Sequence, residues 1–100
     1  MRILLEKDTE SGGKFYELVA YEYKDEATGE PNECVVNIRF GKLNTQGQTL
    51  PKSFTGQGCR AEATDLMRKK FNEKVAEGYV VVENDTDFAE KEMQPARVSW

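Results

Sequence analysis

The sequence contains no histidine, and only Cys34 and Cys59 of its 100 residues are cysteines. Without histidine the usual zinc sites lack their nitrogen ligands, and two cysteines alone do not complete a set of four ligands. The same absence removes the imidazole base that a cysteine-dependent hydrolase needs. We therefore expect two free thiols, no metal or cofactor, and a protein that is not an enzyme.

Long apolar runs are also missing. The first charge after the apolar residues Ile3, Leu4 and Leu5 is Glu6, whereas a secretory signal needs roughly 7 to 15 apolar positions. No run approaches the roughly 18 residues that span a bilayer. With 38% hydrophobic and 32% charged residues, the composition is typical of a globular domain. These features predict a single soluble, cytoplasmic domain without membrane contact.

Acidic residues are absent from one segment, residues 34–61, although the whole chain carries a net charge of −4. This segment has four basic side chains, Arg39, Lys42, Lys52 and Arg60, whereas acids outnumber bases on both sides of it. Affinity for a phosphate backbone depends on lysines and arginines that displace counterions. The distribution of charge therefore points to the middle segment as the working surface.

Side-chain periodicity predicts an α+β fold. Residues 14–24 alternate in a way typical of a strand whose two faces are both partly apolar. Further strands are expected at residues 2–7, 34–40, 49–55 and 79–83, with a glycine-containing turn over 41–48 and Leu50 and Phe54 pointing inward. A helix is expected over residues 60–77, with Gly78 after its end and with inward residues Ala63, Leu66, Met67, Phe71 and Val75. The expected architecture is an antiparallel sheet of four to five strands packed on one amphipathic helix.

Several short motifs occur in a particular order along the chain. They are Lys14-Phe15-Tyr16-Glu17, Arg39-Phe40-Gly41-Lys42, Thr45-Gln46-Gly47-Gln48, Phe54, Ala63, Phe71, Lys74 and Gly78-Tyr79. In order and spacing they resemble the WGR domain. The resemblance predicts a WGR-like domain over residues 1–83 and leaves residues 84–100 as an acidic C-terminal tail.

WGR domains take their name from a Trp-Gly-Arg signature at the end of a strand, and they occur in poly(ADP-ribose) polymerases and in bacterial stand-alone proteins. The resemblance implies a curved antiparallel sheet with one helix, and DNA contact at the signature. Here the signature positions hold Phe40, Gly41 and Lys42. Phenylalanine keeps a flat ring without the indole N–H, and lysine keeps the charge without the guanidinium fork. Only the binding module is matched, not the catalytic domain of the polymerases.

The predicted function is binding of nucleic acid, with DNA ends or breaks as the expected target. The candidate site combines cations, amide groups and a ring for stacking: Arg39, Phe40, Lys42, Gln46, Gln48, Lys52 and Arg60. Two alternatives remain open. The glycines and cations can simply serve a solvated hairpin, or the acidic outer thirds can recruit a basic protein partner, with no nucleic acid involved. The sequence does not specify an oligomeric state.

Overall fold

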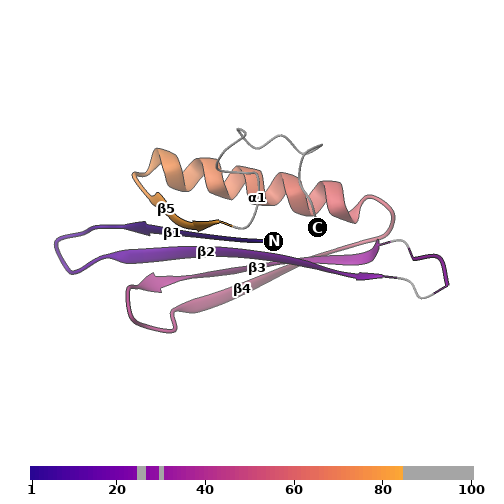
Figure 1. Cartoon of the computed structure of the whole chain (residues 1–100), viewed down its shortest axis with the longest axis horizontal. Coiled ribbons are helices and arrows are strands. Elements are labelled where there is room, and N and C mark those ends of the chain that lie inside the picture. Colours follow the sequence, from indigo (N-terminus) through magenta and orange to yellow (C-terminus); the bar gives the residue numbers. More distant parts are fainter. Residues whose placement is uncertain (25–26, 30, 85–100) are drawn as a thin grey trace.

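The computed structural model describes residues 1–24, 27–29 and 31–84. Five strands form one antiparallel sheet in the order β4-β3-β2-β1-β5, and one helix packs on a single face of it (Figure 1). The elements are β1 (Arg2–Lys7), β2 (Lys14–Lys24), β3 (Pro31–Lys42), β4 (Gln48–Thr55), α1 (Cys59–Ala76) and β5 (Val80–Asn84). The α+β class and the sheet with one helix are as predicted, and α1, the helix of the described part, is not long and apolar enough to cross a membrane.

The predicted elements all occur. β1 and β2 have the predicted bounds, and the other elements have shifted ends. β3 is longer than predicted, from Pro31 to Lys42, because its pairing with β2 extends over the whole length of that strand, from Lys14 opposite Lys42 to Lys24 opposite Pro31. α1 begins and ends one residue earlier than expected. The predicted acidic tail, residues 84–100, lies outside the described residues except for Asn84, the last residue of β5.

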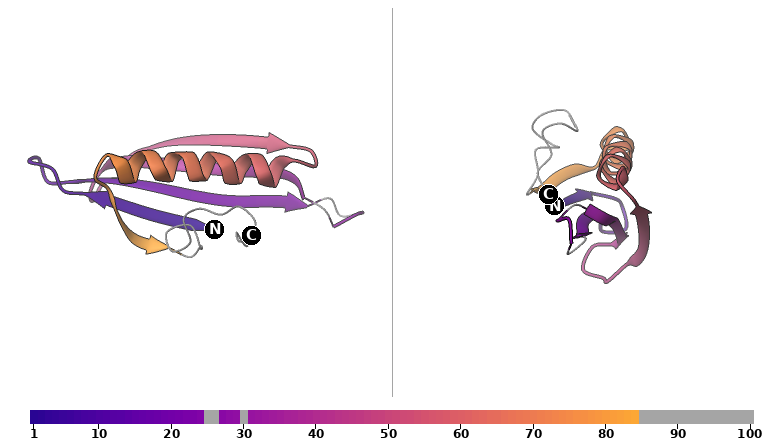
Figure 2. Two further views of the ribbon diagram at one scale, coloured as in Figure 1. Left: turned by 90° about the horizontal axis from the view of Figure 1, so that it is seen from above. Right: turned by 90° about the vertical axis from the view of Figure 1, so that its right-hand side faces the viewer.

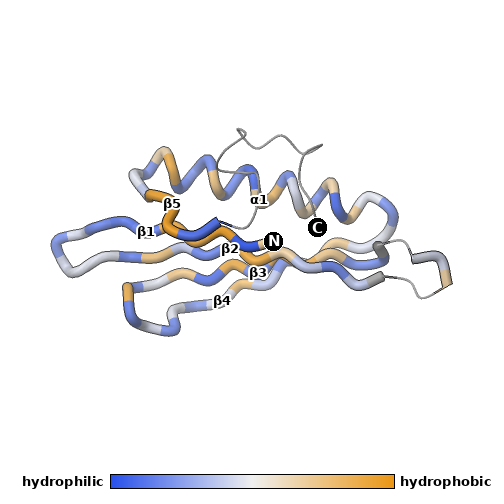
Figure 3. The backbone as a smooth tube through the Cα atoms, in the orientation of Figure 1, coloured by the Kyte–Doolittle hydropathy of each residue, from blue (hydrophilic) through white to orange (hydrophobic). Residues whose placement is uncertain are grey.

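The core lies between the sheet and α1, which covers one face and runs along the strands (Figure 2). Alternate strand residues point toward the helix because side chains in a strand alternate between faces. The buried residues of this cluster are Ile3, Leu5, Tyr16, Leu18, Ala20, Cys34, Val36, Ile38, Cys59, Ala63, Met67 and Phe71. Figure 3 shows hydrophobic residues in the middle of the strands, where this core lies, and a hydrophilic turn between β1 and β2.

Two residues predicted to point inward are substantially exposed. Val75 is 46% exposed. The residues Cys59, Ala63, Met67 and Phe71 are buried at intervals of four. Four residues of a helix turn through about 400°, so each of these side chains points about 40° further round the helix than the one before. At Val75 this drift has turned the side chain away from the sheet. Leu50 is also 46% exposed, because β4 is an edge strand with a neighbour on one side only.

The face of the sheet away from α1 is also partly apolar, as predicted for residues 14–24. Phe15 is only 4% exposed on this face, and Val35 only 6%. The guanidinium of Arg39 lies 4.5 Å from the centre of the Phe15 ring, and Gly47 lies against the ring edge. A cation and a turn therefore shield this aromatic side chain from water.

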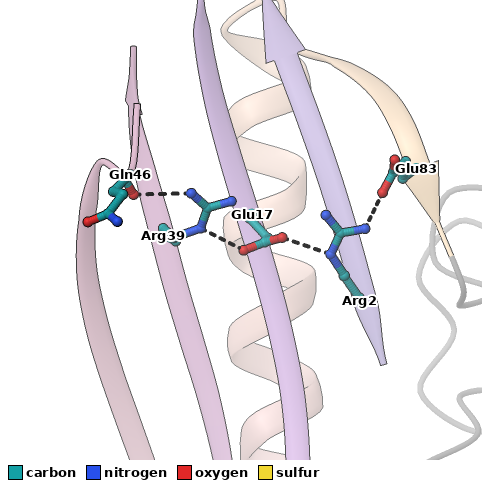
Figure 4. Close-up of polar contacts among 5 residues, drawn as sticks. All are labelled: Arg2, Glu17, Arg39, Gln46 and Glu83. Atoms are coloured by element: carbon teal, nitrogen blue, oxygen red, sulfur yellow. Dashed lines mark hydrogen bonds and ion pairs between the residues drawn. The ribbon is translucent and has the colours of Figure 1, made fainter. Parts of the chain in front are cut away.

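A chain of polar contacts crosses the same face (Figure 4). The Glu17 carboxylate accepts hydrogen bonds from Nε of Arg2 at 2.7 Å and from Nε of Arg39 at 2.9 Å. Arg2 also donates to Glu83, so β5, β1, β2 and β3 are linked side by side. Burial alone would raise the pKa of Glu17, but the bonds from Arg39 and Arg2 outweigh burial and hold that pKa below its usual value.

The turn between β3 and β4 folds so tightly that two glycine positions touch. A Cβ atom at Gly41 would lie 2.8 Å from Cα of Gly47. A Cβ atom at Gly47 would lie 2.2 Å from the carbonyl oxygen of Phe40 and 2.8 Å from Cζ of Phe15. Gly47 also has a φ of +68°, in the left-handed region that favours glycine. Both the space and the backbone conformation at residue 47 therefore require glycine.

Replacement of Gly47 by alanine should lower the free energy of unfolding by about 3 kcal/mol or more, because the new methyl group meets backbone atoms that cannot move aside. Gly29→Ala is the matched control. Its φ of +72° carries the same backbone strain, but no atom lies within 4 Å of the added Cβ. It should cost only about 1 kcal/mol. Urea denaturation of both variants measures the difference, and equal losses would contradict the close approach.

Candidate nucleic-acid-binding site

A pocket of about 340 Å³ opens at the end of the sheet where α1 finishes. Side chains from four places line it: the start of β2, the end of β3, the last turn of α1, and Glu77 and Tyr79 just after that helix. The lining residues are Lys14, Phe15, Tyr16, Phe40, Gly41, Lys42, Lys74, Glu77 and Tyr79. In Figure 1 this is the end at which the β1–β2 turn and the turn between β3 and β4 both lie.

Aromatic rings form the walls of the pocket. The Tyr16 and Phe40 rings are stacked, with centroids 6.2 Å apart and an angle of 25° between their planes. Tyr79 meets Tyr16 edge to face at 6.4 Å. Tyr16 and Phe40 are neighbours because they are register partners on β2 and β3 and point toward the helix side. Tyr16 is only 6% exposed, whereas Phe40 and Tyr79 are half-buried, so the accessible ring surface of the pocket belongs to Phe40 and Tyr79.

The end of α1 brings the third ring into place. Gly78, with a φ of +99°, reverses the chain in a Schellman motif, in which the Tyr79 N–H donates to the Lys74 carbonyl at 3.0 Å. This hydrogen bond holds Tyr79 beside Lys74, whose Nζ lies 4.7 Å from the Tyr16 centroid and 5.5 Å from the Tyr79 centroid. The Lys74 ammonium also approaches the Glu77 carboxylate at 3.3 Å. The predicted helix stop at Gly78 is thus also what completes the pocket.

Three lysines stand in a row across three strands beside these rings. Lys7 of β1 is the register partner of Lys14 of β2, which in turn is the partner of Lys42 of β3. All three point toward the helix side, because each lies two residues from a residue of that face. Like charges directly opposite each other on neighbouring strands are destabilising. Among the described residues that line the pocket, Glu77 alone is acidic, so the surroundings are strongly positive.

The family model for the WGR domain matches residues 1–86. This chain belongs to the WGR domain family. A WGR domain is a small binding module rather than a catalytic unit, and it is known from nucleic-acid-binding contexts. The residues predicted from the sequence to stand at the signature positions, Phe40, Gly41 and Lys42, all line the pocket.

A solved structure of a protein from Bacteroides fragilis shares the fold of this WGR domain, with a TM-score of 0.59 at 23% sequence identity. The similarity covers 92% of this chain but only 26% of that protein, so the chain spans about a quarter of its length. No curated protein is similar enough to this chain to count as a match.

The structure brings some of the predicted site residues to the pocket. Phe40 forms a wall, and Lys42 stands exposed at the rim. Gln48 is the register partner of Phe40 on β4, with an exposed side chain. These three residues therefore form one surface around the WGR signature. Among the described residues, no three His, Cys, Asp or Glu side chains group as ligands for a metal ion.

Other predicted residues lie elsewhere. Arg39 points away from the helix, where it bonds to Glu17 and donates from Nη1 to the Gln46 carbonyl at 3.1 Å. Lys52 stands exposed on the edge strand β4, as the partner of Val36. Arg60 lies in the first turn of α1, about 21 Å along the helix from Lys74. Adjacent strand residues point to opposite faces, so the basic segment does not form one patch.

Sequence reasoning did not assign five residues of this site: Lys7, Lys14, Tyr16, Lys74 and Tyr79. Three of the WGR-like motifs contained four of them, so the signal was present in the order of motifs but not in the charge count. Lys14 and Lys7 lie in the acid-rich first third of the sequence. The pairing register, rather than distance along the chain, places them beside Lys42.

The Tyr16 phenol should make stability depend on alkaline pH. Burial, assisted by Glu73, Glu77 and Tyr79, raises the pKa of Tyr16 to about 12, whereas the pKa of tyrosine in an unfolded chain is about 10. The folded state therefore favours the neutral phenol. Its stabilising contribution is complete below pH ~10 and is lost as pH rises toward ~12, by up to about 2 kcal/mol.

Denaturation of the Tyr16→Phe variant at several alkaline pH values tests this expectation. The free energy of unfolding of the variant should fall less between pH ~10 and ~12 than that of the wild type. Tyr21→Phe is the control, because Tyr21 is 42% exposed on the other face of the sheet. Parallel curves for all three proteins would show that the Tyr16 phenol is not protected by burial.

Proposed function

We propose that this WGR domain is a non-catalytic module that binds DNA at ends or breaks, and that the pocket around Phe40 is the contact site. The observation that carries the proposal is the lysine row, Lys7, Lys14 and Lys42, beside a pocket with aromatic walls. Cations next to flat rings suit a ligand that combines phosphate with a planar base or a sugar.

The rings favour an end or a break over the middle of a duplex. Inside a duplex both faces of every base are covered by neighbouring bases, so a protein ring has no free face to stack on. At a terminus or nick the last nucleotide exposes one face, and stacking of a base on an aromatic side chain contributes about 1 to 3 kcal/mol. A pocket of about 340 Å³ at the tip of the domain can take one such unit.

The lysines supply the affinity for phosphate. Lys42 and Lys14 are exposed at the pocket, whereas Lys74, which also lines it, and the neighbouring Lys7 are half-buried. If all four contact phosphates of a duplex, log K should fall with log salt with a slope of about −3 to −4. Binding should therefore be weak at physiological salt and clear at about 50 mM.

Charge reversal at the pocket tests the site. In fluorescence anisotropy at about 50 mM salt, Lys14→Glu and Lys42→Glu should each weaken binding to a nicked or blunt duplex by about tenfold or more and reduce the salt slope by about 1 to 2. The preference for ends or breaks is measured with a duplex of the same sequence that has no nick and is closed by a hairpin loop at both ends. This closed duplex should bind more weakly than the nicked or blunt one.

Two charge reversals away from the pocket serve as controls. Lys52 is exposed on β4 and Lys69 is exposed on α1, so each replacement by glutamate changes the net charge by the same amount without touching the pocket. Both controls should keep affinity within about threefold of the wild type. Equal losses at all four positions, or no binding by the wild type, would overturn the proposed site. In the latter case a basic protein partner becomes the better hypothesis.

Restoration of the family signature should strengthen binding. Phe40→Trp enlarges the stacking surface and adds an N–H donor, and Lys42→Arg adds a bidentate fork for phosphate. The double variant should bind the nicked duplex several-fold more tightly than the wild type, with little change for the closed duplex. Thermal melting checks that the larger ring is accommodated. A well-folded double variant with unchanged or weaker binding would contradict a role for these positions.

A further inference from the structure

Folding brings the two cysteines of the chain together. Cys34, on the helix side of β3, and Cys59, the first residue of α1, are 25 positions apart in sequence, yet their Sγ atoms lie 2.8 Å from each other. Both residues are fully buried. Both have free thiols in this structure. The pair thus joins the start of the helix to the sheet, at the opposite end of α1 from the pocket.

The surroundings hold this end of the helix in place. In register, Cys34 lies between Glu22 of β2 and Phe54 of β4. The Glu22 carboxylate accepts two hydrogen bonds from the Arg60 guanidinium, each 2.6 Å long. Gly58, the N-cap residue, offers no side-chain hydrogen bond to the helix. The first turn of α1 is therefore held by tertiary contacts, chiefly those of Cys59 and Arg60, rather than by a cap.

We propose that Cys34 and Cys59 are a modification site, at which a small-molecule disulfide of the glutathione type converts the two thiols into an intramolecular disulfide that fastens α1 to β3. A disulfide bond needs its sulfur atoms about 2.0 Å apart. The two Sγ atoms therefore have to approach by only about 0.8 Å.

The reaction proceeds by two exchanges. A Cys59 thiolate attacks one sulfur of the oxidant, whose S–S bond breaks and releases one small thiolate. Cys34 then loses its proton to solvent and attacks the Cys59 sulfur, and the mixed disulfide releases the second thiolate. The two protein thiols give up two electrons and two protons, and the oxidant is reduced to two small thiols. Each small thiolate takes up one proton.

Access determines the order of these steps. Both thiols are buried, so the oxidant reaches a sulfur only when the first turn of α1 opens. That opening exposes Cys59 first, whereas Cys34 is in a strand paired on both sides. Burial also raises the pKa of Cys34 to about 12, which keeps it a thiol until the second step. The disulfide should therefore form slowly in the folded protein.

Oxidised glutathione, added to the full chain after complete reduction, tests the proposal. The expected product is a monomer that has lost two hydrogen atoms by intact mass and shows no free thiol after denaturation. Because the crosslink closes a loop of 25 residues, the melting temperature of the oxidised protein should exceed that of the reduced protein by on the order of 10 °C. Dithiothreitol should reverse this gain. Cys34→Ser and Cys59→Ser should show no such gain. Two glutathione adducts, dimers, or a disulfide without a thermal gain would overturn the proposal.

An equilibrium measurement covers the case in which the folded protein reacts too slowly. The reduced chain is refolded from urea in mixtures of reduced and oxidised glutathione, and the disulfide fraction is compared with that in urea. Folding should favour the disulfide on the order of 100-fold, because it favours the disulfide by the same factor by which the disulfide favours folding. Equal fractions with and without urea would show that the fold does not position the two sulfurs for a bond.

Loosening the first turn of α1 tests the access route. Arg60→Gln removes the ion pair with Glu22 and should speed oxidation several-fold. Arg68→Gln is the matched control. Arg68 pairs with Asp65 within the same helix, so its replacement leaves the ion pair between Arg60 and Glu22 of the sheet intact. Equal rates for both variants and the wild type would contradict opening at the helix start.

Discussion

The pairing register of β2 is the constraint on which the rest of the structure depends. β2 is the middle strand of five, and a slip of one residue would move Tyr16 and Leu18 from the helix side to the opposite face. Glu17 resists such a slip, because its carboxylate is held between Arg2 on one neighbouring strand and Arg39 on the other. Contacts on one face thus set the position of the core residues on the other.

The same register imposes a cost at the end of the sheet. It places Lys14 directly between Lys7 and Lys42, and each pair of like charges opposes folding. The Lys7 ammonium reduces this cost by donating to the Glu77 carbonyl at 2.6 Å, where the end of the helix is electronegative. Nothing comparable neutralises Lys14 and Lys42 among the residues that line the pocket. An anion bound there would relieve the repulsion, so the proposed binding at this row of side chains would also stabilise the fold.

Local pattern was sufficient to predict the elements of this fold. Alternation located the strands, and helical spacing with Gly78 located the helix to within one residue at each end. These signals are local, because strand alternation and helix termination depend on residues a few positions apart. The exposure of Val75 and Leu50 was not predictable in this way. It depends on how long the helix stays against the sheet and on which strand lies at the edge, and both are properties of the assembled fold.

The site was only partly predictable, for a reason visible in Arg39 and Phe40. They are adjacent in sequence and therefore point to opposite faces of β3, so a charge count along the chain combines side chains that the sheet separates. A sheet instead adds charges across its strands. Lys14, from a segment in which acids predominate, thereby joins Lys42 from the acid-free segment. The local concentration of positive charge is real, but its position follows from strand pairing, and the WGR-like order of motifs pointed to it more accurately than composition did.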